Sequence, residues 1–360
     1  MNPDIAELAD FIRTNTQLAH QACVSQEIKP IRYRFAAVPI DVWVTSASIQ
    51  EVIDPVIAHA RDTSDPTVMA ETQPANVYAI DAASLGLAGP PSKWHFPEQN
   101  QQDYQRICWQ PEDGLALTSD DSRGIWHLWD MRQVEGAYWV ADTERLPYWE
   151  FASPLRHFIH WVCLEHGIAM IHAAAIGQQG HGVLLTGKGG SGKSTLTAAA
   201  VSHGWQTVGD DFVLLRFAQG KVYAYPIFDI LKLTGMAEEW FADLLKQPLN
   251  PNRAANEKAM VRLSDIAGQS FVDGLEVHAI FSQTLTHASS SRFSPISKIK
   301  AVAALAPSTM NILRTAMPVT LKDCGRLAKA LPTYSLGVGQ DPNETLGVLE
   351  NWMKSELGHV

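Results

Sequence analysis

The sequence has few cysteines, no excess of basic residues and no long apolar run. Only four of its 360 residues are cysteines, and their spacing fits neither a zinc motif nor a dense disulfide framework. This usage is typical of a reducing compartment, so we expect a cytoplasmic protein. The first fifteen residues are acidic and amphipathic and lack the apolar segment of a signal peptide. The cysteines are Cys23, Cys108, Cys163 and Cys324.

The charge balance and the apolar pattern exclude two further classes of partner. The chain has 28 basic and 38 acidic residues, a net charge of −10, which disfavours binding to a polyanion such as nucleic acid. Its longest apolar stretch, residues 158–176, is interrupted by Glu165 and three histidines, so we expect no membrane span. Apolar residues make up 46% of the chain, which is enough for sizeable cores.

A glycine-rich motif carries the strongest functional signal. Residues 183–195 read VLLTGKGGSGKST, in which an apolar strand precedes the pattern G-x-x-x-x-G-K-[ST] and an alanine-rich helix follows it. Glycines at these positions let successive backbone N–H groups curl around phosphate oxygens. The predicted nucleotide-binding residues are Gly187, Lys188, Gly189, Gly190, Ser191, Gly192, Lys193, Ser194 and Thr195.

The end of this motif predicts how a nucleoside triphosphate is held. Lys193 is expected to reach the β- and γ-phosphates, and the Ser194 hydroxyl to bind Mg²⁺. The helix expected from Thr195 to His203 directs its positive N-terminal end at the same anion, and Gly204 follows as a helix terminator.

Two adjacent carboxylates follow the next predicted strand. Asp210 and Asp211 come after strand 205–208, seventeen residues beyond Lys193. A strand that follows a crossover helix runs parallel to the first, so its carboxyl end lies beside the loop. One carboxylate is expected to hold Mg²⁺ and the other to accept the proton of an attacking hydroxyl. Ser194 and Asp211 are the candidate metal ligands, but the sequence leaves the division of roles between the two carboxylates open.

Several other residues are candidates of lower specificity. His172 lies in a predicted strand at 171–176, antiparallel to the loop strand, and is a candidate catalytic residue. Lys232 and Lys258 are candidates for contacts with the nucleotide phosphates, and Arg253 and Arg262 could bind the γ-phosphate or an anionic substrate. The alternative for the four basic residues is solvated surface charge.

The run HAAAIGQQGHGVLLTGKGGSGKSTLTAAAVSHGWQTVGDD resembles the HPr kinase/phosphorylase family and its kinase-like relatives, whose phosphate-loop fold is shared with phosphoenolpyruvate carboxykinase. The resemblance covers about residues 150–360. It implies an α/β fold: a P-loop kinase domain with a mixed sheet at 151–360. A smaller α+β domain at 1–150 is expected to precede it and to recognise substrate or partner. The resemblance also implies ATP as the nucleotide and makes a homo-oligomer plausible.

The departures from this family concern the substrate. Thr195 stands where true HPr kinases have an acidic residue, and we find no Glu-x-Arg-Gly segment in the C-terminal half. We therefore expect an ATP- and Mg²⁺-dependent kinase that acts on a hydroxyl other than that of HPr. Its acceptor is a small molecule such as a sugar or serine, or a Ser/Thr of a peptide or protein. The alternatives are a nucleotide-dependent switch or scaffold with slow hydrolysis, and carboxykinase-like or phosphorylase chemistry.

Overall fold

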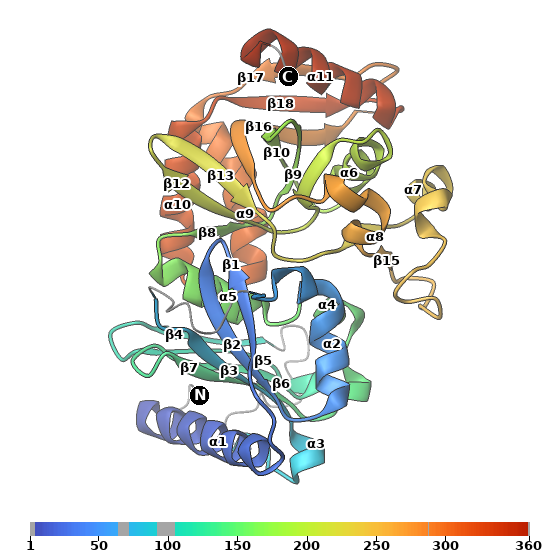
Figure 1. Cartoon of the computed structure of the whole chain (residues 1–360). Coiled ribbons are helices and arrows are strands. Elements are labelled where there is room, and N and C mark those ends of the chain that lie inside the picture. Colours follow the sequence, from blue (N-terminus) through green and yellow to red (C-terminus); the bar gives the residue numbers. More distant parts are fainter. Residues whose placement is uncertain (1–3, 64–71, 92–104, 287, 359–360) are drawn as a thin grey trace. The chain divides into compact units, whose positions relative to one another are not determined.

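The chain forms two compact units, each with a mixed sheet and flanking helices (Figure 1). The computed structural model describes residues 4–63, 72–91, 105–286 and 288–358, and of residues 105–108 the backbone alone. The first unit comprises Met1–His166 with Arg314–Ala316, and the second comprises Gly167–Leu313 with Met317–Val360. Among the described residues, no helix combines the length and apolar character needed to cross a membrane.

The sheet of the first unit has seven strands with both parallel and antiparallel pairs. The pairs β2–β3 and β3–β7 are parallel, and the remaining pairs are antiparallel. The strands, in spatial order, are β1 (Ile31–Phe35), β2 (Val38–Val44), β3 (Ala75–Asp81), β7 (Glu135–Val140), β6 (Ile125–Asp130), β5 (Leu115–Asp120) and β4 (Gln105–Gln110).

Helices cover both faces of this sheet because its strands alternate buried side chains between the faces. Trp126 and Leu128 of β6 pack in the same core as Leu8 and Ile12 of α1, whereas Trp129 contacts Phe158 of α5 on the other face. The helices of this unit are α1 (Ile5–Ser25), α2 (Ala47–Ile57), α3 (Ala82–Leu85), α4 (Tyr148–Ala152) and α5 (Arg156–Glu165).

The second unit contains a nine-stranded mixed sheet built around the long strand β16. Strand β16 is parallel to β10 and β18 and antiparallel to β13. In spatial order the main path is β11 (Gln206–Gly209), β9 (Ala174–Gln178), β10 (His181–Thr186), β16 (Leu275–Leu285), β13 (Lys221–Tyr225), β12 (Val213–Ala218) and β8 (Ala169–Ile171). Strand β18 (Thr333–Val338) pairs with β16 and with β17 (Arg292–Pro295), and β14 (Leu231–Leu233) pairs separately with β15 (Ala259–Val261).

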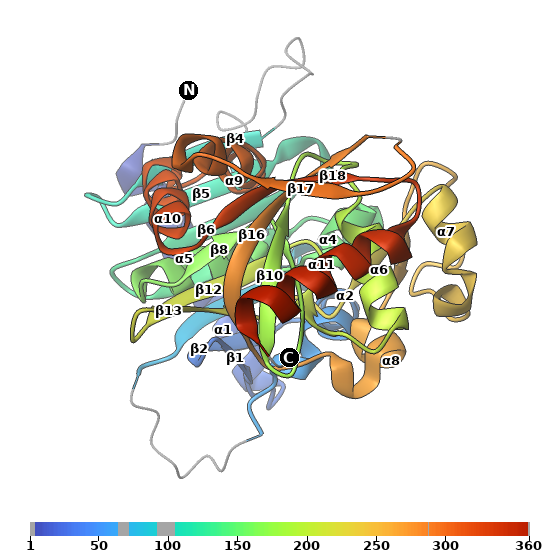
Figure 2. The same ribbon diagram turned by 90° about the horizontal axis from the view of Figure 1, so that it is seen from above.

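Two helical layers enclose the sheet of the second unit. One core joins Leu305 and Leu327 of α9 and α10 to Leu184 of β10, and another joins Leu196 of α6 and Leu349 of α11 to the other side of the sheet. Figure 2 shows α11 and α6 near one another over β10. The helices are α6 (Lys193–Ser202), α7 (Met236–Trp240), α8 (Leu263–Ala267), α9 (Lys298–Leu313), α10 (Met317–Ala330) and α11 (Pro342–Leu357).

The observed elements differ from the expected ones in three respects. Residues 171–176 do not form one strand: β8 ends at Ile171, and β9, which is antiparallel to β10 as expected, begins at Ala174. Strand β11 does run in the direction of β10, but β9 lies between them. The two units divide after His166 rather than after residue 150, because α5 packs against β6 of the first unit.

Candidate nucleotide site

The candidate phosphate loop, residues 187–194, connects β10 to α6 in a conformation that requires glycine. Gly187 has φ +150°, and a Cβ there would lie 2.6 Å from the Ser191 Oγ and 2.7 Å from the Gln283 carbonyl oxygen. Gly190 and Gly192 also have positive φ values, of +77° and +95°. A Cβ built on Gly189 or Gly190 meets no atom within 4 Å, so open space lies over the middle of the loop.

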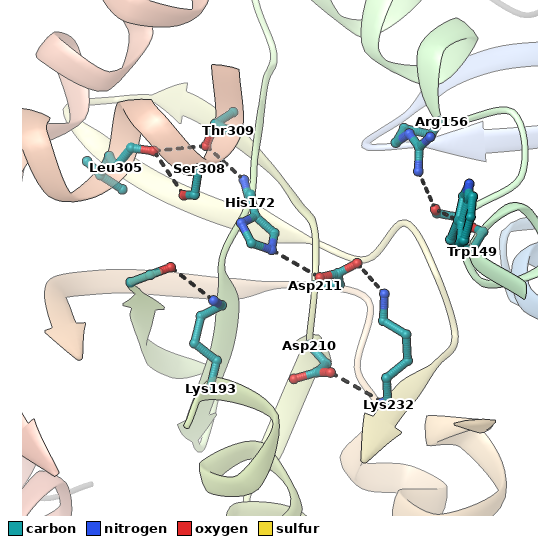
Figure 3. A network of polar contacts seen from close by, with 12 residues as sticks. Trp149, Arg156, His172, Lys193, Asp210, Asp211, Lys232, Leu305, Ser308 and Thr309 are labelled. Carbon is teal, nitrogen blue, oxygen red and sulfur yellow. Dashed lines mark hydrogen bonds and ion pairs between the residues drawn. The ribbon is translucent and has the colours of Figure 1, made fainter. Parts of the chain in front are cut away.

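Lys193 is buried at the start of α6, behind this open space. Its side chain folds back over the loop, and Nζ donates a hydrogen bond of 3.1 Å to the Gly187 carbonyl oxygen (Figure 3). Burial lowers the pKa of Lys193, while the charges of Asp210 and Asp211 act to raise it. The ammonium group thus has carboxylates nearby and a backbone acceptor that an anionic ligand could replace.

Asp210 and Asp211 follow β11, as the sequence predicts, but they have different surroundings. Asp210 is 2% exposed, and its Oδ1 has no hydrogen-bond partner among the described residues. Burial raises the pKa of Asp210, the charge of Asp211 raises it further, and the nearby Ser194 hydroxyl lowers it. A buried carboxyl with one unpaired oxygen is well placed to accept a proton or a cation.

Asp211 is held by two cationic or hydrogen-bonding side chains. Its Oδ2 lies 2.6 Å from Lys232 Nζ, and its Oδ1 lies 3.1 Å from His172 Nε2. Burial acts to raise the pKa of Asp211, yet Lys232 and His172 together hold it well below its usual value. Asp211 is therefore ionised at neutral pH, and this charge contributes to the raised pKa of Asp210.

His172 lies in the short connection between β8 and β9, and α9 fixes it. Its backbone N–H donates to the Thr309 Oγ1 over 3.1 Å, and the Thr309 hydroxyl in turn donates to the Leu305 carbonyl oxygen. The His172 ring packs 5.3 Å from the ring of Phe212 (centroid to centroid). These contacts hold the imidazole toward Asp211 (Figure 3).

The small β14–β15 sheet positions the candidate lysines. Lys232 lies in β14, and its backbone N–H also donates to Asp210 Oδ2 over 3.4 Å. Lys258 directly precedes β15, and its charge lowers the pKa of Lys193, which places the two ammonium groups within electrostatic reach. The candidate arginines instead form ion pairs outside this group, Arg253 with Glu238 and Arg262 with Asp265.

Sequence reasoning did not find Gln283, a buried residue of β16 beside the loop. Its side chain is 2% exposed, and neither polar atom of the amide has a partner among the described residues. The backbone carbonyl oxygen of Gln283 lies against Gly187. No motif marks Gln283, because its position depends on the pairing of β16 with β10. Thr309 was missed for the same reason, since only the packing of α9 brings it to His172.

The fold and the site define a mixed α/β protein with a glycine loop, a buried lysine and a carboxylate pair at one sheet edge. No family model matches the sequence, and no curated protein matches it. Among solved structures, the chain is similar to the Hpr(Ser) kinase/phosphatase from Coxiella burnetii. The TM-score is 0.31 and the identity 14%, over 53% of this chain and 99% of that chain. This likeness is distant, so the functional argument depends on the site geometry.

The residues of the site fit a triphosphate with a divalent cation. The open space over Gly189 and Gly190, the N-terminus of α6 and the Lys193 ammonium all suit an anion. The hydroxyl of Ser191 and Oδ1 of Asp210 are buried polar atoms without partners among the described residues. Hydroxyl and carboxylate oxygens, such as those of Ser194 and Asp211, are ligands that Mg²⁺ accepts together with phosphate oxygens. The unpaired Asp210 Oδ1 remains available to accept a proton.

Proposed function

We propose that this chain is an ATP- and Mg²⁺-dependent kinase that transfers the γ-phosphoryl group to a hydroxyl acceptor. The acceptor class is a small molecule such as a sugar or serine, or a Ser/Thr side chain of a peptide or protein. The observation that carries the proposal is the carboxylate pair beside Lys193, in which burial raises the pKa of Asp210 while Lys232 and His172 keep Asp211 ionised. Carboxyls whose pKa values are pushed apart are suited to different roles in one reaction.

In this proposal Asp210 is the general base. The acceptor oxygen attacks the γ-phosphorus, the bond from that phosphorus to the bridging β-phosphate oxygen breaks, and ADP leaves. The acceptor proton moves to Asp210, whose raised pKa and unpaired Oδ1 suit this role. Lys193 stabilises the charge on the β- and γ-phosphates.

The metal role is assigned to Ser194 and Asp211. Bound Mg²⁺ would neutralise charge on the phosphate oxygens. Asp211 suits a metal ligand because its pKa stays low, and Lys232 and His172 orient its two oxygens. Lys258, whose charge lowers the pKa of Lys193, adds positive charge that would attract the triphosphate.

The test is transfer of label from γ-labelled ATP. The protein is incubated with Mg²⁺ and pools of metabolites and peptides, and labelled products are identified by mass spectrometry. A labelled hydroxyl compound that forms with wild type but not with Lys193→Ala supports the kinase. Nucleotide binding or phosphate release without any labelled acceptor would contradict it and favour the nucleotide-dependent switch.

A second measurement separates the two carboxylates. Asp210→Asn is expected to lower kcat by roughly 100-fold or more, since general-base catalysis contributes about 100- to 10,000-fold, with little change in the Mg²⁺ concentration required. Asp211→Asn is expected to raise that Mg²⁺ concentration as well. If both variants kept full turnover, the proposed mechanism would be wrong.

A further inference from the structure

A second group of potential ligands lies at the other end of β10 from the candidate phosphate loop. His181 begins β10, and Glu276 and His278 lie in the neighbouring strand β16. One ligand atom from each residue lies within 4.8 Å of the other two. Strand β10 has six residues, so roughly 17 Å separate this cluster from the loop that follows Thr186.

The sheet itself brings the three side chains together. His181 is in register with Glu276, and His278 is the extra residue of the bulge that follows the Gly182–Val277 pair. His181 Nδ1 and His278 Nε2 are 2.8 Å apart, and His278 Nε2 is 3.7 Å from Glu276 Oε1. Two imidazole nitrogens and a carboxylate oxygen therefore lie within 4.8 Å of one another, close enough for one ion to contact all three.

We propose that His181, Glu276 and His278 form a binding site for a first-row divalent transition metal ion, with Zn²⁺ as the representative ion. Two imidazoles and one carboxylate are a common set of zinc ligands, whereas Mg²⁺ and Ca²⁺ prefer oxygen ligands. Zinc-bound nitrogens lie about 3.3 Å apart in a tetrahedral site with Zn–N of about 2.0 Å. The two nitrogens, 2.8 Å apart in their hydrogen bond, would therefore separate by roughly half an ångström as the ion takes the place of the hydrogen-bonded proton.

The surroundings suit a metal site. The side chains of His278 and Glu276 are 22% and 16% exposed, so an ion can enter and water can complete its coordination. Lys221 Nζ lies 2.8 Å from Glu276 Oε2, which leaves Oε1 facing the histidines and fixes the carboxylate as outer-shell partners do.

A bound ion would link the two central strands of the second unit. The candidate loop follows the carboxyl end of β10 and lies beside Gln283 of β16, and the metal cluster connects these strands at the opposite end of β10. Because the ion binds the folded chain, it stabilises this unit by mass action. The site is distinct from the Mg²⁺ ligands proposed above both in position and in ligand type.

The test uses the full-length protein after treatment with a chelator. Zn²⁺ is titrated by calorimetry, and Co²⁺ is added as a spectroscopic probe of coordination. We expect one tight Zn²⁺ per chain, a raised unfolding temperature, and visible Co²⁺ absorption typical of a tetrahedral site. The variants His181→Ala and Glu276→Gln should each weaken Zn²⁺ binding by roughly 100-fold or more, since they remove a ligand.

Two controls make the result specific. His166→Ala removes an exposed histidine outside the cluster and should bind Zn²⁺ like wild type. Asp210→Asn should also keep the tight site, which excludes Zn²⁺ bound at the nucleotide site. Circular dichroism confirms that each variant is folded. Wild-type protein without a tight site, or variants that bind as tightly as wild type, would show that the cluster is a hydrogen-bonded network only.

Discussion

Lys232 and Asp211 form an ion pair with 2.6 Å between Nζ and Oδ2, although they lie 21 residues apart, Asp211 between β11 and β12 and Lys232 in β14. Their side chains are 12% and 23% exposed, so solvent screens the pair only in part. The backbone N–H of Lys232 also reaches the other carboxylate, that of Asp210, over 3.4 Å. Strand β14 thus contacts both acids, and a change at Lys232 is expected to affect the chemistry of the pair.

The first prediction concerns the pH dependence of phosphoryl transfer in Lys232→Met. The lysine charge lowers the pKa of Asp211, so its removal raises that pKa and leaves less of the ionised form at mildly acidic pH. We expect a lower kcat/KM and an acidic limb of the pH–rate profile that moves to higher pH. The measurement is kcat/KM for ATP across the acidic range.

The matched control for this prediction is Lys246→Met. Lys246 is 74% exposed and pairs with Asp243 in the second unit, so its loss removes one positive charge without touching Asp211. An equal shift of the acidic limb in both variants would show a general effect of net charge rather than the Lys232–Asp211 pair.

The second prediction concerns Gly187→Ala. A Cβ at this position would lie 2.6 Å from the Ser191 Oγ and 2.7 Å from a backbone carbonyl, and its φ of +150° strains any other residue. The loop must therefore change shape. We expect loss of nucleotide binding, at least roughly 10-fold in Kd, since several backbone N–H groups lose their alignment together. Binding of a fluorescent ATP analogue measures this.

Gly325→Ala is the control for the glycine substitution. Gly325 lies within α10, has no positive φ, and a Cβ there meets no atom within 4 Å. Alanine at this position should bind nucleotide like wild type and should raise stability by up to about 1 kcal/mol, the helix-propensity difference between the two residues. If Gly187→Ala also bound nucleotide normally, the 187–194 loop would not be the phosphate site.

Local features of the second unit could be predicted from the sequence, because they depend on neighbouring residues. The strand, loop and helix around Gly187 follow from an apolar run, glycine spacing and an alanine-rich segment. The position of Asp210 and Asp211 follows from the length of one helix and one strand. Lys232 was a candidate from its alternating strand pattern, and the structure brings it to Asp211.

The remaining features depend on pairings between distant segments, which no local pattern specifies. Strand β16 lies between β10 and β13, and this placement brings Gln283 to the loop and His278 to His181. Strand β9 separates β10 from β11 for the same reason. Lys232 could be proposed as a contact for the nucleotide phosphates, but its ion pair with Asp211 could not, since that pair requires β14 to lie beside both acids.

The third prediction concerns the buried ion pair of the first unit. Arg156 Nη2 lies 3.4 Å from Glu150 Oε1, and the Tyr138 hydroxyl donates to the other carboxylate oxygen. Burial raises the pKa of Glu150, and the Arg156 charge lowers it. Arg156→Met leaves a buried carboxylate without its cation, which is expected to cost about 3 to 5 kcal/mol of unfolding free energy. Urea denaturation at neutral pH measures this loss.

The double variant Arg156→Met/Glu150→Gln tests the cause of that loss. Removing the carboxylate charge as well should recover a large part of the lost stability, because replacing both members of a buried pair costs far less than removing one. Recovery of less than a quarter would mean that Arg156 acts through packing of its aliphatic stem and not through the charge of Glu150.

The fourth prediction is acid destabilisation of the first unit by buried neutral histidines. Burial lowers the pKa of His127 to about 3 and that of His160 to about 4, from the ordinary value of 6.5. Between the lowered pKa of each histidine and its ordinary value of 6.5, the unfolded chain binds more protons than the folded chain. The free energy of unfolding therefore rises with pH over this interval. Stability is therefore lost as the pH falls from about 6.5 toward about 4, by roughly 2 kcal/mol for each histidine between pH 7 and pH 5.

Urea denaturation at pH 7 and pH 5 checks this, with tryptophan fluorescence as the probe because Trp126 and Trp129 are buried in the same unit. His160→Gln cannot take up a proton, so it should lose roughly 2 kcal/mol less than wild type over this pH interval. His166→Gln, at an exposed histidine just beyond α5, should keep the pH dependence of wild type. Identical pH dependence in all three proteins would mean that the acid sensitivity of this unit arises from its carboxylates.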